Sequence, residues 1–288
     1  ILGTDAPVHD LLRLGMGPWL RTMLGAYGRA FDVEVYSIDR EDFSSRLAAV
    51  HHPLGAGLRL PKAIRQILYH ARLVSRARRM SGVVRVLSPN IPVLREIGRL
   101  SGSATIVDYH YDWASTAKTH YGGTKGMLAA PVQRRCVGAA DLIIATTRDL
   151  ARDIEKRYGK RAITIPNFVD TDLFRPREPR RETILFAGRF HWAKGVSVLI
   201  EAFTRIASDH PHAELILFGS GEQDDELRRQ TPDSLRERIR FLGSRPQEDV
   251  AREMGSAAVC ALPTLTTEGN PKAVLEAMAC GTPLVCSV

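Results

Sequence analysis

Short β-branched segments alternate with helical patterns along the chain, and this alternation limits the possible folds more than any other feature. The segments expected to form strands are 32–38, 83–88, 104–110, 141–147 and 162–166 in the first half, then 183–188, 213–219, 238–243, 257–263 and 282–287. Helical patterns of crossover length separate most of them. Strands joined in this way are typical of parallel sheets covered by helices.

A chain of 288 residues has the length of about two domains, at roughly 100–200 residues each. The passage 166–182 is rich in proline and arginine, and Pro176 and Pro179 interrupt both periodicities. We therefore predict an α/β protein with two tandem Rossmann-like domains and a cleft between them. The first is expected to span residues 1–170 and the second 183–288, joined by a linker at 171–182.

Both ends of the sequence suggest truncation. The first residue is Ile1 and not methionine, and the chain stops at "TPLVCSV", inside an apparent strand of the second domain. We expect the second domain to be incomplete at its C-terminus. The true N-terminus and any signal sequence are left open.

The composition is that of an ordinary water-soluble protein, with 44% hydrophobic and 25% charged residues. A net charge of +8 favours anionic partners, but it does not choose among phosphorylated substrates, nucleic acid and an acidic membrane. The four cysteines form no CxxC pair and sit in apolar stretches, which predicts reduced core thiols in a cytoplasmic protein. No apolar run approaches the ~18 residues of a membrane span.

Two cations follow the expected strand 183–188, in "RFHWAKG". In open parallel sheets, ligands bind beyond the carboxyl ends of the strands. Arg189 and Lys194 lie there between Gly188 and Gly195. A guanidinium fork and an ammonium point charge together suit a diphosphate. The alternative is two solvated surface cations, in a chain that has 40 lysines and arginines.

The stretch "EGNPKAVLEAMACGTPLV" places Glu268 and Glu276 around a Gly-Asn-Pro turn. Proline at the first helical position and a glycine stop predict a helix over 271–280. Its N-terminus, preceded by Gly269 and Asn270, offers free amides to an anion.

Glu276 lies in the second half of this helix, where the helix dipole disfavours a carboxylate. Lys272 precedes it by four residues, which is the weaker order for an ion pair, and small side chains surround it. A ribose diol could donate two hydroxyls to the carboxylate. We expect Glu268 to face a sugar and Glu276 a nucleoside, against the alternative of a surface salt bridge.

Five motifs stand in the order and spacing of a known family. They are "ADLIIATTRDLARDI", "IPNFVDTDLFRP", "ILFAGRFHWAKGVSVLIEAF", "LILFGSGEQDDELR" and "EGNPKAVLEAMACGTPLV". The chain resembles glycosyltransferase family 4, which has the GT-B fold. The likeness covers most of the chain and is strongest from 141 to 287.

The resemblance implies transfer of a sugar from a nucleotide-diphosphate donor, with retention of configuration and without a metal or a cofactor. By position, Arg189 and Lys194 would hold the diphosphate and offset charge on the leaving group. Glu268 would contact the donor sugar and Glu276 the ribose. His110 matches the family's strand-end histidine near the transferred sugar.

The resemblance also implies a set of backbone contacts to the substrate. Gly15 and Gly17 match the glycine-rich loop after the first strand, although "GMG" replaces adjacent glycines. Gly219, Gly269 and Asn270 complete the expected substrate-binding residues. The donor would bind the second domain and the acceptor the first.

Three weaker patterns receive plain interpretations. Asp170-Thr171-Asp172 spells a metal-binding DxD, but it lies in the expected linker, so we interpret it as coincidence. The pair His51-His52 precedes a proline in an expected loop, and His191 is interpreted as incidental. "GMGPWL" and "GSGEQD" each carry a lone GxG, which is weak evidence for dinucleotide binding.

The segment 61–79 predicts an amphipathic, basic helix. Ile64, Ile67, Leu68, Ala71 and Val74 form one stripe, and four arginines cluster on a different side. An outer crossover helix with solvated arginines and a helix that docks on an anionic membrane are both compatible with the pattern. Nucleic-acid binding is disfavoured, because no recognition motif accompanies the charge.

These observations predict a retaining glycosyltransferase of the hexosyltransferase type, cytoplasmic and peripheral on the inner face of the membrane, with an acceptor that is a sugar or a lipid-linked glycan. A non-catalytic nucleotide-sugar binder is the alternative from another class. A nucleotide-sugar epimerase of the same fold is a second alternative. The residues do not select the nucleobase, the sugar, the acceptor or the oligomeric state.

Overall fold

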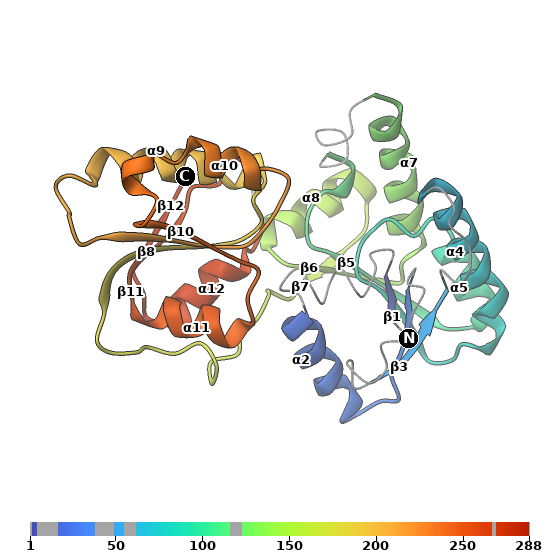
Figure 1. The fold of residues 1–288 in the computed structure, drawn as a ribbon. Coiled ribbons are helices and arrows are strands. Elements are labelled where there is room, and N and C mark those ends of the chain that lie inside the picture. Colours follow the sequence, from blue (N-terminus) through green and yellow to red (C-terminus); the bar gives the residue numbers. More distant parts are fainter. Residues whose placement is uncertain are drawn as a thin grey trace. The chain divides into compact units, whose positions relative to one another are not determined.

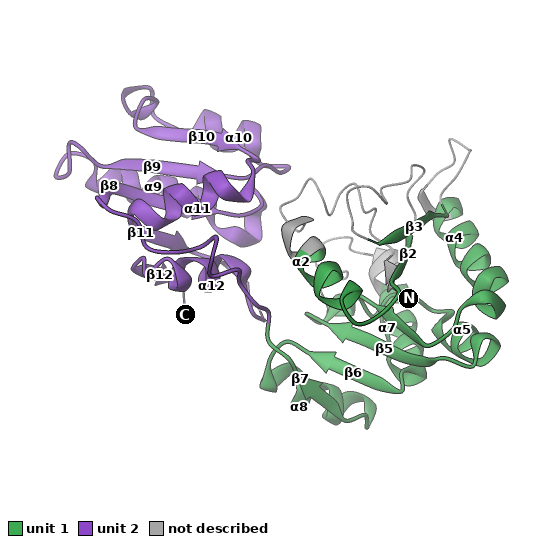
Figure 2. Ribbon diagram, turned by 90° about the horizontal axis from the view of Figure 1, so that it is seen from below, with its two compact units in different colours: residues 1–166 green, residues 167–288 purple. Residues whose placement is uncertain are grey.

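The computed structural model describes residues 2–4, 17–37, 49–54, 62–115, 123–266 and 269–287. The chain forms two compact units, residues 1–166 and residues 167–288, which are coloured separately in Figure 2. Each unit contains its own parallel sheet with helices packed against it (Figure 1). The expected α/β class with two Rossmann-like units is confirmed.

Within the described residues, unit 1 has a seven-stranded parallel sheet in the order β3-β2-β1-β4-β5-β6-β7. The strands are β1 (Leu2–Thr4), β2 (Glu34–Ser37), β3 (Val50–Pro53), β4 (Val83–Val86), β5 (Ala104–Tyr109), β6 (Leu142–Ala145) and β7 (Ala162–Thr164). The helices are α2 (Gly17–Gly28), α4 (Lys62–Arg76), α5 (Leu94–Ser101), α7 (Gly123–Ala139) and α8 (Arg148–Tyr158), with a 3₁₀ turn η1 (Ala77–Arg79) after α4.

Unit 2 has a five-stranded parallel sheet among its described residues, in the order β10-β9-β8-β11-β12. The strands are β8 (Arg181–Ala187), β9 (Glu214–Phe218), β10 (Ile239–Gly243), β11 (Ala257–Leu262) and β12 (Leu284–Cys286). The helices are α9 (Val196–Ile206), α10 (Asp224–Gln230), α11 (Gln247–Ser256) and α12 (Lys272–Ala279), and the 3₁₀ turns are η2 (Trp192–Lys194) and η3 (Asp233–Leu235).

The sheet of unit 2 is buried on both faces, which explains why its strands read as continuous apolar runs. Successive residues of a strand point to opposite faces. In β8, Leu185 joins one core cluster and Phe186 the other, and in β9 the same division separates Ile216 from Leu217. Strand order reverses between β8 and β11, and the carboxyl ends of these two strands are therefore the place to look for a ligand.

Helix α8 illustrates how local sequence sets the element boundaries. The Thr147 hydroxyl accepts a hydrogen bond from the Leu150 N–H at 3.2 Å and so caps the start of the helix. Gly159 ends it in the left-handed conformation with φ 63°. The preceding strand β6 and this helix form the expected unit "DLIIATTRDLARDI".

Two expectations from the sequence are wrong in this part of the structure. His51 and His52 do not lie in a loop but in β3, which pairs in parallel with β2. The His51 side chain is buried, and its Nε2 lies 2.8 Å from the Ser37 hydroxyl, which satisfies a polar ring inside the sheet. Cys286 is an exposed thiol on β12, whereas the other three cysteines are buried as expected.

The segment 171–182, expected to be a linker, lies within unit 2. The Phe174 side chain is 1% exposed and packs in the core cluster between the sheet and α11 and α12. Strand β8 already begins at Arg181. Asp170 closes a turn here, because its carboxylate accepts hydrogen bonds from the N–H groups of Asp172 and Leu173 at 3.0 and 3.2 Å. The DxD carboxylate therefore has a structural task.

Replacing Phe174 with alanine should lower the stability of unit 2 by about 3–5 kcal/mol, because the change opens a cavity in a packed core. Phe168→Ala is the matched control: that ring lies six residues earlier and is 43% exposed. Thermal unfolding followed by circular dichroism compares the two variants. Equal unfolding midpoints would mean that the segment around Phe174 is a solvated connector and no part of the core.

Candidate functional site

The carboxyl end of β8 carries the first part of the site. Strand β8 ends at Ala187, and the loop that follows leads through η2 into α9. Arg189 is exposed on this loop, and Lys194 is half-buried at the end of η2. Gly195 occupies the N-cap position of α9, so the free amides of an eleven-residue helix begin directly after Lys194. Two cations and a helix N-terminus here favour an anion.

Glycines bring the loops of this site into backbone contact. A Cβ on Gly219 would lie 1.8 Å from the Gly188 carbonyl oxygen, and one on Gly221 would lie 2.2 Å from the Phe190 oxygen. A Cβ on Gly195 would lie 1.9 Å from the Pro263 oxygen. Both Gly195 (φ 64°) and Gly219 (φ 140°) also have backbone angles that suit glycine. The loops after β8, β9 and β11 therefore form one continuous backbone surface.

Hydrogen bonds fix these loops to one another. The Phe190 N–H donates to the Ser220 carbonyl at 3.0 Å, and the Gln223 N–H donates to the Phe190 carbonyl at 3.1 Å. The Leu265 N–H reaches the Ala193 carbonyl at 2.8 Å, which joins the loop after β11 to η2. Arg189 and Lys194 are thus carried by a loop that backbone hydrogen bonds hold in place.

His191 and Glu222 are site residues that the sequence analysis missed. The His191 ring is buried, and its Nδ1 accepts a hydrogen bond from the Ala193 N–H at 3.2 Å, which caps η2. Its Nε2 lies 3.1 Å from one Glu222 carboxylate oxygen, while the other oxygen lies 3.7 Å from the Arg189 guanidinium. The His191 ring therefore has a structural role, because it holds the turn that carries Lys194.

The loop before α12 carries the second part of the site. Glu268 lies outside the described residues. Gly269 is exposed and Asn270 is half-buried, and the Asn270 carbonyl accepts a hydrogen bond from the Asn167 side-chain amide at 2.6 Å. Helix α12 begins at Lys272, with Pro271 at the N-cap position, close to the expected span 271–280.

Glu276 is the most perturbed carboxyl group of the site. Burial raises its pKa to about 7, although the Lys272 ammonium and a 3.3 Å hydrogen bond from the Gln247 side-chain amide act in the opposite direction. Burial also lowers the pKa of Lys272 to about 8, against the attraction of Glu276. The alternative of an ordinary surface salt bridge is therefore wrong: the carboxyl sits in a desolvated position that lacks a strong partner.

Among the expected residues of unit 1, His110 lies at the carboxyl end of a strand. His110 follows β5 directly and is half-buried, and Gly17 is the first residue of α2. Gly15 lies outside the described residues. Next to His110, the buried Asp108 carboxylate accepts bonds from the Arg85 guanidinium at 2.9 and 3.0 Å. Burial raises the pKa of Asp108, while Arg85 and His110 oppose the shift.

The sequence contains a signal from which the contact between Arg85 and Asp108 could have been predicted: each is a charged residue inside an apolar strand. Arg85 stands within "VVRVLS" and Asp108 within "ATIVDYH", on the neighbouring strands β4 and β5. Opposite charges in apolar strands that pair are expected to meet.

No metal centre is evident among the described side chains. They contain no group of three or more histidine, cysteine or carboxylate residues placed to hold an ion. The structure brings Arg189, Lys194 and Gly219 together at the carboxyl edge of the unit 2 sheet, beside the loop that leads to Asn270 and Glu276.

Comparison with protein families now identifies the class. A family model described as glycosyl transferases group 1 matches residues 181–288. A model of glycosyltransferase family 4 matches residues 15–173. Both halves of the chain thus match glycosyltransferase models. The second match covers more than half of the chain. The chain belongs to glycosyltransferase family 4.

Individual relatives agree with this assignment. The chain is similar to a phosphatidyl-myo-inositol mannosyltransferase of Mycolicibacterium smegmatis, with 33% identity over 215 residues that cover 71% of the chain and 53% of the relative. A D-inositol 3-phosphate glycosyltransferase of Corynebacterium jeikeium is 29% identical over 180 residues, 54% of this chain and 43% of the relative. The chain spans about half the length of the curated relatives it matches.

Solved structures show the same fold. Anabaena HepE in complex with UDP and glucose aligns with a TM-score of 0.76 at 18% identity, over 99% of this chain and 79% of that protein. Sucrose-phosphate synthase from Thermosynechococcus elongatus aligns with a TM-score of 0.74 at 19% identity, over 100% of this chain and 81% of that protein. The fold is GT-B.

The shifted pKa values predict an unusual pH dependence of stability. Folded Glu276 keeps its proton up to about pH 7, whereas the unfolded carboxyl loses it near 4.5, so the free energy of unfolding should fall as pH rises through this window. Folded Lys272 loses its proton near 8 and the unfolded side chain near 10.5, so the free energy of unfolding should rise again there. Glu276→Gln should remove the lower branch, measured as unfolding midpoints at the two ends of the window.

Glu248→Gln is the control, because that exposed carboxylate lies one residue from Gln247. The control should keep the fall in unfolding midpoint, a few °C, that we expect for the unchanged chain. If Glu276→Gln retained the same fall, another group would be responsible for it.

Proposed function

We propose that this chain transfers a sugar from a nucleotide-diphosphate donor to an acceptor hydroxyl, with retention of configuration, as a hexosyltransferase. The observation that carries the proposal is that two cations, Arg189 and Lys194, lie just before the start of α9. The loops around them approach so closely that only glycine fits at the contact points. Membership of glycosyltransferase family 4 supports it. So does the relative named as a phosphatidyl-myo-inositol mannosyltransferase, and HepE is a structural neighbour bound to UDP and glucose.

The cations would act on the leaving group. When the donor bond breaks, negative charge builds on the diphosphate, and fixed positive groups lower the energy of that state. Without a ligand, the Glu222 carboxylate is 3.7 Å from the Arg189 guanidinium. A bound diphosphate would take the place of Glu222 as the partner of Arg189. In this proposal the two side chains and the helix amides do the electrostatic work, with no metal or cofactor.

The other expected residues have proposed tasks at the same donor. Glu276 would accept hydrogen bonds from the ribose hydroxyls, and Glu268 would contact the donor sugar. Gly219, Gly269 and Asn270 would bring backbone groups to the donor. His110 would lie near the transferred sugar, and the backbone at Gly15 and Gly17 would approach the substrate. No described side chain stands out as a base for the acceptor hydroxyl, so we propose that a donor phosphate oxygen takes that proton.

Removal of either cation should stop the reaction. Arg189→Ala and Lys194→Ala should each lower transfer by at least about a hundredfold, because each removes charge stabilisation from the transition state. The assay follows release of nucleoside diphosphate from a panel of UDP- and GDP-sugars, and circular dichroism checks the fold.

Arg205→Ala is the matched control: this arginine is exposed at the end of α9, where it pairs with Glu201 at 2.5 Å. It should leave turnover unchanged. Near-normal turnover in both site variants contradicts the proposal. Donor binding by calorimetry without any product would support the non-catalytic binder instead.

We further propose that helix α4 docks unit 1 on an anionic membrane, on the cytoplasmic side, where a sugar or lipid-linked glycan acceptor would be met. The core side of α4 is formed by Tyr69 and Leu73. Of the apolar stripe noted in the sequence, Val74 packs against the core, whereas Ile64, Ile67 and Leu68 are 44%, 67% and 37% exposed.

Basic residues follow the exposed stripe at the C-terminal end of the helix. Arg76 is exposed at the end of α4, and Arg78 and Arg79 are exposed in η1. Arg72 is engaged instead with the Leu54 carbonyl at 2.5 Å. An exposed apolar stripe flanked by arginines is the pattern of helices that lie in the membrane interface. None of the described helices is both long and apolar enough to cross a bilayer.

Sedimentation with lipid vesicles tests this surface. Ile67→Ser should weaken binding to phosphatidylcholine vesicles that contain phosphatidylglycerol by about tenfold, because it removes one apolar side chain from the interface. Ile206→Ser, which alters an exposed isoleucine in unit 2, is the control. Equal binding of the two variants, or equal binding with and without phosphatidylglycerol, would count against docking through α4.

A further inference from the structure

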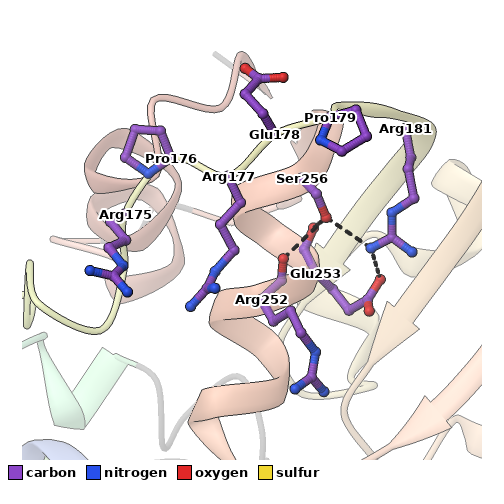
Figure 3. Close-up of a pocket in the computed structure, with 9 residues that line it drawn as sticks. All are labelled: Arg175, Pro176, Arg177, Glu178, Pro179, Arg181, Arg252, Glu253 and Ser256. Carbon is purple, nitrogen blue, oxygen red and sulfur yellow. Dashed lines mark hydrogen bonds and ion pairs between the residues drawn. The ribbon is translucent and has the colours of Figure 1, made fainter.

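An open basic cavity lies in unit 2, at the opposite edge of the sheet from Arg189. It has a volume of about 770 Å³ and is lined by residues 175–179, by Arg181 and by residues at the end of α11 (Figure 3). Strand β8 begins at Arg181, and β11 begins directly after α11. Because β8 is seven residues long, the cavity lies roughly 20 Å from the Arg189 loop.

The lining carries more positive than negative charge. Four arginines and two glutamates line it. One of the arginines, Arg181, is neutralised by the Glu253 carboxylate at 2.5 Å and also donates to the Ser256 hydroxyl at 2.8 Å. Arg252 pairs with Asp249 on its own helix. The charges of Arg175 and Arg177 are not balanced by an ion pair within the described residues.

Arg177 is held in place by the backbone of α11. Its N–H donates to the Gly255 carbonyl at 3.0 Å. A Cβ on Gly255 would lie 2.6 Å from the Arg175 carbonyl oxygen and 3.0 Å from Cγ of Arg177, so only glycine leaves room for this segment. The Arg177 Nε is buried and has no hydrogen-bond partner among the described residues.

The side chains are arranged as an anion site would require. In Figure 3 the guanidinium groups of Arg175, Arg177 and Arg252 extend in the same direction, whereas the Glu178 carboxylate points away from them. Surface arginines with no ligand usually keep their polar atoms in water, and a buried Nε without a partner is unfavourable. A bound anion would supply the missing acceptor.

We propose that this cavity binds a soluble anion that carries two or more phosphate groups. One guanidinium group can donate two parallel hydrogen bonds to the oxygens of a phosphate. Two arginines whose charges are not balanced could therefore bind two phosphate groups. The volume also exceeds the need of a single phosphate ion. The lining contains the carboxylates of Glu178 and Glu253, which would repel an anionic bilayer and which a small soluble anion can avoid.

Calorimetry with inorganic tripolyphosphate tests the proposal. The titration uses the full chain with Arg189→Gln and Lys194→Gln, so that tripolyphosphate cannot bind to the cations of the Arg189 loop. That background should still bind tripolyphosphate. Adding Arg177→Gln should weaken binding by about tenfold, the loss of one charge-assisted hydrogen bond, and Arg175→Gln should act in the same direction. Arg177→Lys should restore binding only in part, since it keeps the charge without the fork.

Arg205→Gln in the same background is the matched control and should leave the affinity unchanged. Arg175 is exposed, so its variant is expected to fold even if a change at Arg177 disturbs the turn. The proposal is overturned if the Arg189/Lys194 background binds no tripolyphosphate, or if Arg175→Gln and Arg177→Gln bind as tightly as Arg205→Gln.

Discussion

The candidate site in unit 2 depends on one constraint, the close approach of three backbone segments beyond the carboxyl edge of the sheet. The turns after β8, β9 and β11 approach so closely that a single methyl group at Gly195, Gly219 or Gly221 would overlap a carbonyl oxygen. The hydrogen bonds between these turns then fix where Arg189 and Lys194 leave the chain. The cations are long and flexible, but the points from which they extend are not.

Electrostatics adds a second level to this arrangement. Arg189 and His191 both contact Glu222, so the ligand-free loop holds its own counter-charge. Glu276 is in the opposite situation, since desolvation opposes its ionised form and Lys272 compensates only in part. In the proposed function, Glu276 would gain a partner that donates hydrogen bonds, and Glu222 would be replaced at Arg189 by a partner that accepts them. A nucleotide-diphosphate sugar contains both kinds of group.

The sequence predicted the elements well because strand and helix periodicity are local properties. Each strand expected in unit 2 is present, and the motif order placed Arg189, Lys194, Gly219 and Glu276 correctly on strand ends and helices. Contacts between distant segments were harder to foresee. The hydrogen bond of His51 with Ser37 and the burial of Phe174 depend on residues that are distant in the sequence and meet only in the fold.

The apolar stripe of α4 is a second case in which the sequence did not reveal a tertiary contact. Periodicity identified the stripe, but two apolar faces compete on this helix, and the core is formed by Tyr69 and Leu73 and not by Ile67. The sequence also gave no means to separate arginines that are neutralised, such as Arg181, from those such as Arg177 that are not. Such a distinction depends on which side chains meet in the folded protein.

The buried pair of Arg85 and Asp108 has a consequence for the history of the chain. Loss of either partner would leave an uncompensated charge inside the sheet of unit 1, at a cost of about 3–5 kcal/mol, while replacement of both by apolar residues can be neutral. A substitution at only one of the two positions would therefore lower the stability of unit 1. In a lineage of such proteins, β4 and β5 should keep this pair together or abandon it together, and intermediates with one half of it should be rare.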